Sequence, residues 1–367
     1  MPVTKPGFKV GEGFFMLFTY FAGMQSAGQF QQFIHPFSKK LLAINAASLP
    51  IADYSKRYLQ HLLENHLYYL EIYASVLEQL LQHTPKSPAQ IAMADFGSGN
   101  GLLGMFAKFA GFKNVWLCDM DAAFVQASQV LAGELDLELD GYVTGSIEEL
   151  KAAVAHQPLD AVVGTDVIEH IYSIPNFLQV IACMNAAMVT VLTTASNPHN
   201  FLKCRKLAKL QLQDELQGSN PADFELAGPS VTRPFLQIRK EIIEDAFPGL
   251  PAGDLERLAR ATRGLIKADI LEASAAFLQT GDLPKADDRW PNTCNPHTGT
   301  WTERILPITT YRHMYEANGF ALQMTNGFHN RHAEGIKKNV NLFRNGIVKL
   351  SGKYAAPFIT LIGYKSA

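Results

Sequence analysis

Cysteine is scarce in this chain, and an excess of charge of one sign is nearly absent: 367 residues contain four cysteines and carry a net charge of −2. The cysteines lie far apart without a paired spacing, at positions 118, 183, 204 and 294. This argues against a disulfide framework and favours a reducing cytoplasm. The near-neutral charge leaves no global basic footprint for nucleic acid, so we expect no nucleic-acid partner.

Apolar runs long enough to span a membrane are also missing, so we expect no membrane span. The run from Gly13 to Met24 is very apolar and follows Lys5 and Lys9, but it is shorter than the roughly 20 apolar residues that a spanning helix needs. No clean small-residue cleavage site of a signal peptide follows it. We interpret it as a buried or pocket-lining segment, and a membrane-surface anchor is the alternative.

Metal-ligand spacing is a third absence. Cys294 and His297 are separated by two residues, but no second pair accompanies them. The histidines at positions 313, 329 and 332 have no ligand spacing either. We therefore expect no metal site.

What the sequence does contain is a continuous strand–turn–helix–strand unit from Ile91 to Asp121. A buried strand at 91–96 is followed by three glycines, a helix with apolar residues at helical spacing, and a second strand that stops at Asp119. Gly97 and Gly99 allow a sharp turn and a close approach of the backbone to a ligand. An acid at the tip of the next strand can accept hydrogen bonds from a ribose diol. The unit predicts a cofactor that contains a nucleoside.

The spacing of the glycines decides between nucleoside cofactors. The dinucleotide fingerprint is G-x-G-x-x-G, whereas here an acid precedes G-x-G-x-G in the run Asp95-Phe96-Gly97-Ser98-Gly99-Asn100-Gly101. At these residues the chain resembles the class I S-adenosylmethionine-dependent methyltransferases. No G-K-[ST] follows the loop, which excludes a P-loop NTPase.

The resemblance implies roles for residues of the glycine loop and of the next strand. Asp95 would hold the methionine ammonium of the cofactor, and its alternative role is to cap the glycine loop. Gly97, Ser98 and Gly99 would surround the methionine part. Asp119 would bind the ribose, and Met120 would pack on the adenine. Asp121 is better explained as the N-cap of the following helix.

Further candidates follow later strands. Ser146 and Ile147 stand where the family often has an acid that reads the adenine amino group. Asp166 opens the run Asp-Val-Ile-Glu-His, similar to the family's D-x-x-E-H, at the carboxyl edge of the predicted sheet. His170 is either a general base or a wall of the acceptor pocket, or a satisfied histidine at a helix start. Asn197 and His199 are second-rank candidates.

The fold class that the pattern predicts is α/β, with a doubly wound, Rossmann-like parallel sheet. The resemblance implies seven strands and a terminal antiparallel hairpin. We divide the chain into an N-terminal helical cap (1–88), the cofactor-binding core (89–200), a mostly helical insertion (201–305) and the C-terminal part of the sheet (306–367). An insertion of this length is usually functional, and we interpret it as a lid over the acceptor. Within it we predict one long helix from Gly253 to Leu278.

The resemblance therefore implies methyl transfer from S-adenosylmethionine, by in-line displacement, to an O, N or C atom of a small-molecule acceptor. An apolar N-terminal segment and a long lid favour an enclosed pocket. A homo-oligomer stays possible. Two alternatives remain open: an NAD-dependent oxidoreductase, and a non-catalytic methyltransferase-like partner subunit.

Overall fold

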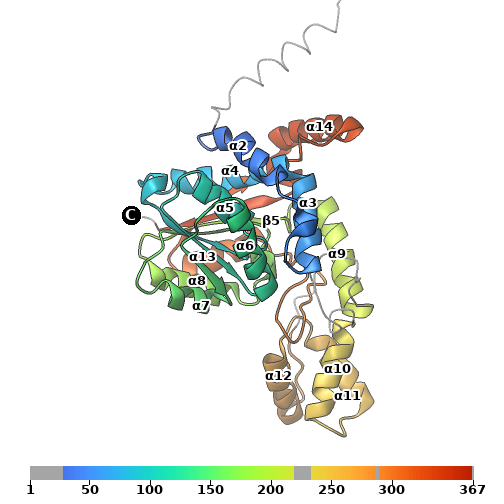
Figure 1. The fold of residues 1–367 in the computed structure, drawn as a ribbon. Helices are drawn as coiled ribbons and strands as arrows, with labels where there is room; N and C mark the ends of the chain where they lie inside the picture. Colours follow the sequence, from blue (N-terminus) through green and yellow to red (C-terminus); the bar gives the residue numbers. More distant parts are fainter. Residues whose placement is uncertain (1–27, 219–232, 286–288, 366–367) are drawn as a thin grey trace, which may run out of the picture.

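The computed structural model of the chain describes residues 28–218, 233–285 and 289–365. The apolar run at 13–24 therefore lies outside the described residues. The core of the described part is a sheet flanked by helices on both faces, with a helical arm extending from one end (Figure 1).

The sheet has seven strands in the order β3-β2-β1-β4-β5-β7-β6. The first five pair in parallel, and β7 lies antiparallel between β5 and β6. This confirms the predicted fold class, including the terminal antiparallel pair. The strands are β1 (Ala92–Phe96), β2 (Asn114–Asp119), β3 (Gly141–Thr144), β4 (Ala161–Gly164), β5 (Val189–Thr194), β6 (Ala321–Asn326) and β7 (Ile359–Tyr364).

The central strands are buried on both faces, which explains their continuous apolar composition. Met93, Val163 and Val191 pack on one face, and Ala94, Val162 and Leu192 pack on the other. Two helical layers cover these faces. The first contains α2 (Gln31–Leu42), α4 (His66–Gln82), α5 (Leu102–Phe109) and α6 (Ala122–Glu134), and the second α7 (Ile147–Ala153), α8 (Ile174–Met184) and α13 (Ile308–Ala317).

The N-terminal region is helical, as predicted, and its helices join the core of the sheet rather than forming a separate unit. After α2 the chain continues through the short helix η1 (Ala46–Ser48) to α3 (Asp53–Glu64), which is separated from α4 by Asn65. Pro88 then starts a single turn, η2 (Pro88–Gln90), before β1. In Figure 1 α3 stands beside the ends of the central strands, which places it near the glycine loop.

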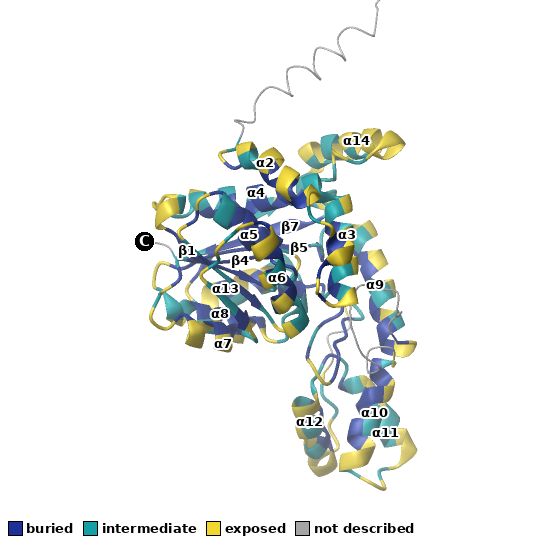
Figure 2. Cartoon of the chain, viewed as in Figure 1, coloured by how far each residue is buried: buried dark blue, intermediate teal, exposed yellow. Residues whose placement is uncertain are grey.

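The insertion begins with α9 (Phe201–Leu216) and continues with α10 (Phe235–Ala246), α11 (Ala252–Ala261) and α12 (Lys267–Thr280). The last three share an apolar core of their own and project away from the sheet (Figures 1 and 2). The predicted single helix from Gly253 to Leu278 is wrong. Gly264 interrupts it with a φ of +81°, and a Cβ at this position would lie 2.6 Å from the Trp301 ring. Helix α10 is absent from the sequence prediction.

The chain returns to the sheet through α13 and β6, as predicted, and then forms α14 (Gly335–Ser351), the short η4 (Gly352–Tyr354) and β7. No helix of the described ranges has both the length and the apolar character needed to cross a bilayer.

Candidate active site

The glycine loop between β1 and α5 has the backbone that its sequence predicts. Gly97, Gly99 and Gly101 have φ values of +66°, +52° and +78°, in the left-handed region that favours glycine. The Gly97 N–H donates to the Cys118 carbonyl (2.8 Å), which ties the loop to β2. The Ser98 N–H donates to the same carbonyl (3.1 Å). The loop is thus held on its strand side.

Asp119 ends β2 directly beside this loop. Its Oδ2 accepts a hydrogen bond from the Gly99 N–H (2.8 Å), and its Oδ1 accepts one from the Asp121 N–H (2.9 Å). Burial raises the pKa of the carboxyl, and these N–H donors act in the opposite direction. Asp121 caps α6 by accepting from the Ala123 N–H, as predicted. The loop and the acid therefore form one connected unit at the carboxyl edge of β1 and β2.

Asp95 is buried below the loop, with 2% of its surface exposed. Its Oδ2 accepts from the Gly104 N–H in the first turn of α5 (2.9 Å). Burial raises the pKa of this carboxyl to about 7; the Gly104 N–H opposes the shift, and the charge of Asp119 adds to it. Asp95 thus bonds to the first turn of α5 and not to the glycine loop, which was its alternative partner, and this bond uses one of its two carboxylate oxygens.

Asp166 lies at the same edge, after β4. Its backbone has a φ of +52°, and its N–H donates to Thr193. Burial and the neighbouring charge of Glu303 raise the pKa of this carboxyl, and Lys203 opposes the shift. The residue is nevertheless exposed to solvent. Asp166 is thus an exposed carboxyl group with other charged groups near it.

Glu303 was not a candidate from the sequence. It has a φ of +47°, and its side chain accepts from the Ser196 hydroxyl (3.0 Å). Among the residues that the structure describes, three residues other than glycine have a positive φ, and two of them are Asp166 and Glu303. Backbone strain of this kind concentrates at functional sites.

His170 lies in the turn η3 (Ile168–His170) that follows Asp166. Its Nδ1 pairs with the Trp301 carbonyl at 2.8 Å. Because a carbonyl only accepts, Nδ1 carries the proton and the neutral ring has its unprotonated nitrogen at Nε2. When protonated, His170 lowers the pKa of Asp166, so the two side chains are close. This tautomer is the one a general base would need.

Glu169, between them in the sequence, is fully buried. Its Oε1 accepts from the Ala195 N–H (3.0 Å), and its own carbonyl accepts from the Arg304 N–H (3.2 Å). Burial raises the pKa of its carboxyl, and the charges of Asp166 and Glu303 add to the shift. Glu169 therefore joins the end of β5 to the loop that carries Glu303, and it supports the site from the buried side.

A group of tyrosines from α3 and α4 faces the acids. The charge of Asp166 contributes to raised pKa values at four of them, and burial is the largest cause at each: Tyr58, Tyr68, Tyr69 and Tyr73. Asp119 also acts on Tyr58, and a Cβ at Gly99 would lie 3.1 Å from the Tyr58 ring. The sequence analysis did not single out these residues. The four phenol groups lie within electrostatic range of Asp166, and Tyr58 lies beside Gly99.

The remaining predicted residues have different surroundings. Met120 is 65% exposed, so its side chain is available for packing on a ligand, whereas Ile147 is buried. Ser146 caps α7 and bonds with Glu148 and Glu149, so its hydroxyl is engaged. Asn197 donates to carbonyls of the C-terminal segment, at Lys353 (2.8 Å) and Ala356 (3.0 Å). This structural role explains Asn197 without any ligand.

Gly104 is a further residue that the sequence analysis missed. Gly99, Gly101 and Gly104 form a G-x-G-x-x-G pattern. This pattern begins two residues after Gly97, the first glycine of the loop. A Cβ at Gly104 would lie 2.3 Å from the Leu117 side chain, so glycine allows α5 to pack closely on β2. This is the packing role of the third glycine in dinucleotide folds.

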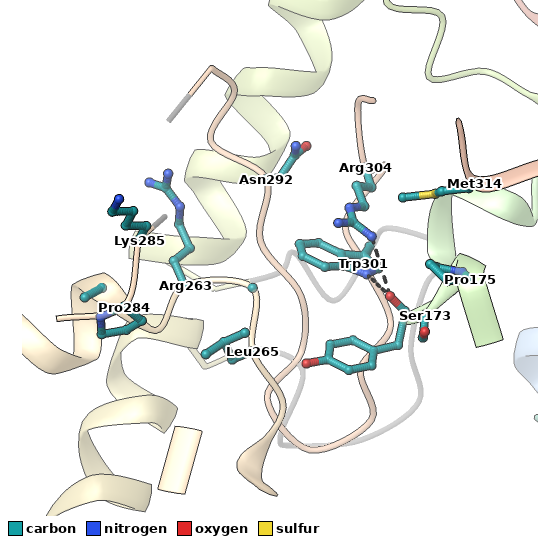
Figure 3. A pocket seen from close by; sticks show the side chains of 13 residues that line it. Ser173, Pro175, Arg263, Leu265, Pro284, Lys285, Asn292, Trp301, Arg304 and Met314 are labelled. Carbon is teal, nitrogen blue, oxygen red and sulfur yellow. Dashed lines mark hydrogen bonds between the residues drawn. The ribbon is translucent and has the colours of Figure 1, made fainter. Parts of the chain in front are cut away.

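A separate cavity of about 410 Å³ lies on the insertion side of the 290–305 loop (Figure 3). Its lining includes Arg263, Trp301 and Arg304, and the Arg304 guanidinium lies 4.0 Å from the centre of the Trp301 ring. The Trp301 Nε1–H donates to the Tyr172 carbonyl (3.2 Å). No residue of the glycine loop lines this cavity, and neither does Asp119. It is therefore distinct from the site at the edge of β1 and β2.

Comparisons with known proteins place this geometry in context. No family model and no curated protein sequence matches the chain. The chain is similar to solved structures of magnesium protoporphyrin IX methyltransferase from Synechocystis PCC 6803 with bound SAH (12% identity, 91% of this chain and 96% of that chain, TM-score 0.39) and of a putative S-adenosylmethionine-dependent methyltransferase from Listeria monocytogenes (12%, 81% and 99%, 0.39).

A third similar structure is that of PKMT2 from Rickettsia typhi in complex with AdoHcy, at 11% identity and a TM-score of 0.39. The match covers 80% of this chain but only 52% of that protein, about half its length. Likeness this weak does not carry a function over to this chain, so the function must be argued from the site itself.

Proposed function

We propose that this chain is an S-adenosylmethionine-dependent methyltransferase that methylates a small molecule. The observation that carries the proposal is the unit of Gly99 and Asp119, in which an acid at the tip of β2 is fastened to a left-handed glycine loop (2.8 Å). It lies in a sheet whose β7 is antiparallel. An acid in this position can receive a ribose diol, and the loop leaves room for the rest of the cofactor.

The acceptor and apolar groups present fit the cofactor. Asp119 offers carboxylate oxygens to the ribose, Asp95 offers a second oxygen toward the methionine ammonium, and Met120 offers an exposed apolar side chain to the adenine. Ser146 is engaged in capping α7, so contacts to the adenine amino group fall to the backbone near Ile147.

When bound, the cofactor supplies a methyl group that is already activated by a positive sulfur. The protein then has to orient the acceptor and exclude water. The Tyr58 ring of α3, which lies beside Gly99, supports an acceptor pocket with an aromatic lining. His170 would take the proton of a hydroxyl or amine acceptor through Nε2. Asp166 and Glu303 would hold the acceptor, or they would stabilise the positive imidazolium ring that His170 becomes once it has taken the proton.

Two parts of the insertion adjoin this pocket: α9, which carries Lys203, and the loop that carries Glu303. We propose that these two segments, together with α3, cover the acceptor, and that α10–α12 support them through their separate core. All four cysteines are free, in keeping with a cytoplasmic enzyme.

The principal competing function is that of an NAD-dependent oxidoreductase, favoured by the G-x-G-x-x-G spacing of Gly99, Gly101 and Gly104. Two observations count against it. The turn off β1 starts at Gly97, two residues before that pattern begins. In addition, β7 lies antiparallel beside β5, whereas the usual dinucleotide-binding order 3-2-1-4-5-6 is built from two βαβαβ halves with parallel strands. A non-catalytic partner subunit is the second competitor, and cofactor binding without turnover on any acceptor would favour it.

The pKa of Asp95 gives a prediction about pH. In the folded protein the carboxyl has a pKa of about 7, above its ordinary value of 3.8. Folding therefore favours the protonated form of Asp95. The contribution of Asp95 to the stability of the fold declines as the pH rises from 3.8 to about 7. A ligand ammonium needs the ionised form. Binding of S-adenosylhomocysteine should therefore tighten about tenfold between pH 6 and pH 8.

Calorimetric titration of the wild type and of Asp95→Asn at both pH values tests this prediction. The amide cannot titrate, so the variant should bind weakly with a flat dependence in this range. Other groups at the site, Asp166 and Glu169, also have raised pKa values, and they remain in the variant. A pH dependence that persists in Asp95→Asn would assign the effect to them and remove Asp95 from the ammonium site.

The role of His170 is tested by His170→Gln, which keeps a donor for the Trp301 carbonyl but has no basic nitrogen. With an acceptor found by screening, turnover should fall about 100-fold while affinity for S-adenosylhomocysteine stays unchanged. His313→Gln is the control, since His313 is an exposed residue of α13, and the turnover of this variant should equal that of the wild type. Equal turnover in wild type and His170→Gln would make His170 a wall of the pocket.

A further inference from the structure

Helix α14 is the most exposed helix of the C-terminal region. None of its seventeen residues is buried. It lies along an outer edge of the molecule, beyond α2 and α4, and its surface is mostly exposed (Figures 1 and 2). Its sequence, GIKKNVNLFRNGIVKLS, contains four basic residues and no acid.

Five of the seven large apolar residues of α14 lie on one face. Ile336, Val340, Phe343, Ile347 and Leu350 follow each other at intervals of four and three residues, which places them in a single stripe. Their exposed fractions are 84%, 40%, 69%, 38% and 91%. An amphipathic helix normally turns such a stripe toward the core, and here the stripe faces solvent.

The hydrogen bonds of the helix explain this orientation. Asn345 lies about 180° around the helix from Ile336. It accepts from the His329 N–H (2.7 Å) and donates to the His329 carbonyl (2.9 Å). Asn341 donates to the Asn330 carbonyl (2.8 Å). The polar face is therefore fastened to the segment after β6, and the apolar stripe is turned outward by construction.

The basic residues beside the stripe indicate what covers it. Lys337 and Arg344 flank the stripe on one side, whereas Lys338 and Lys349 lie on the opposite side of the helix. A second copy packed on this face would bring cations against cations. An anionic lipid surface offers acyl chains to the stripe and negative headgroups to Lys337 and Arg344.

We propose that α14 docks this protein on membrane surfaces that contain anionic lipid, with its apolar stripe inserted among the headgroups. The docking requires no spanning helix and does not depend on the proposed enzymatic function.

Co-sedimentation of the full chain with vesicles tests the proposal. Binding to phosphatidylcholine vesicles with about 30% phosphatidylglycerol should exceed binding to pure phosphatidylcholine by at least about tenfold. It should weaken as salt is added, because exposed charges are screened. Binding to neither vesicle, or equal binding to both, would overturn the proposal.

The variant Phe343→Glu places a charge in the middle of the stripe and should reduce vesicle binding at least about tenfold. Leu278→Glu is the matched control: Leu278 is 51% exposed on α12, in the helical arm, and its replacement should leave vesicle binding unchanged. Circular dichroism confirms that both variants are folded.

Undiminished binding by Phe343→Glu would assign the lipid contact to another segment. A wild-type dimer that Phe343→Glu converts to a monomer in ultracentrifugation would assign the stripe to a second copy. Either result contradicts the proposal.

Discussion

Asp119→Ala is expected to weaken binding of S-adenosylhomocysteine about a thousandfold, because two hydrogen bonds to a charged acceptor are lost at about 2 kcal/mol each. The carboxylate is fastened by the Gly99 and Asp121 N–H groups, so it needs no reorganisation to receive a ribose diol. The same bonds couple the acid to the glycine loop, and their loss also loosens the loop. Isothermal titration calorimetry measures the affinity, and circular dichroism reports the fold.

Asp121→Ala is the matched control for this experiment. Asp121 is an acid two residues away whose side chain caps α6. Its removal should cost about 1 kcal/mol of stability and leave the affinity within a few-fold of wild type. If Asp119→Ala binds as tightly as Asp121→Ala, Asp119 is not the ribose ligand.

Gly99→Val is expected to abolish binding. Gly99 has a φ of +52°, and a Cβ there would lie 3.1 Å from the Tyr58 ring. A branched side chain would collide with α3 and extend into the space beside Asp119. Strain of about 1–2 kcal/mol from the left-handed backbone adds to the steric effect. No heat should be detectable at ligand concentrations about a thousandfold above those that saturate the wild type.

The variant Gly111→Val distinguishes the effect of left-handed backbone strain from the effect of the steric collision at Gly99. Gly111 has a φ of +93°, and nothing lies within 4 Å of a Cβ built on it. It is exposed in the turn between α5 and β2, at the other end of β2 from Asp119. This variant should lose stability and keep its affinity. Retained binding by Gly99→Val would move the cofactor away from the glycine loop.

The parts of the site that sequence predicts are those that are local in the chain. Gly97, Gly99 and Asp119 belong to one strand–turn–helix–strand unit, in which a left-handed turn needs glycine and a strand tip presents the next side chain. Asp166 follows β4 by the same rule, since parallel strands bring their carboxyl ends to one edge. The terminal antiparallel pair followed from the resemblance and is confirmed.

The parts that sequence does not predict depend on packing between distant segments. Glu303 reaches Asp166 from a loop more than a hundred residues later, and no local periodicity marks it. The tyrosines of α3 and α4 share the apolar pattern of any buried helix face, so their position opposite the acids depends on how these helices cross the sheet. The division of α11 from α12 depends on Gly264 packing against Trp301, a contact between two loops.

The central claim is that the glycine loop and Asp119 hold S-adenosylmethionine and not a dinucleotide. Calorimetric titration of the full chain with S-adenosylhomocysteine, and separately with NADH, tests it most directly. We predict one site for S-adenosylhomocysteine with a dissociation constant on the order of micromolar, and no heat from NADH. Binding of NADH, or of neither ligand, would contradict the account.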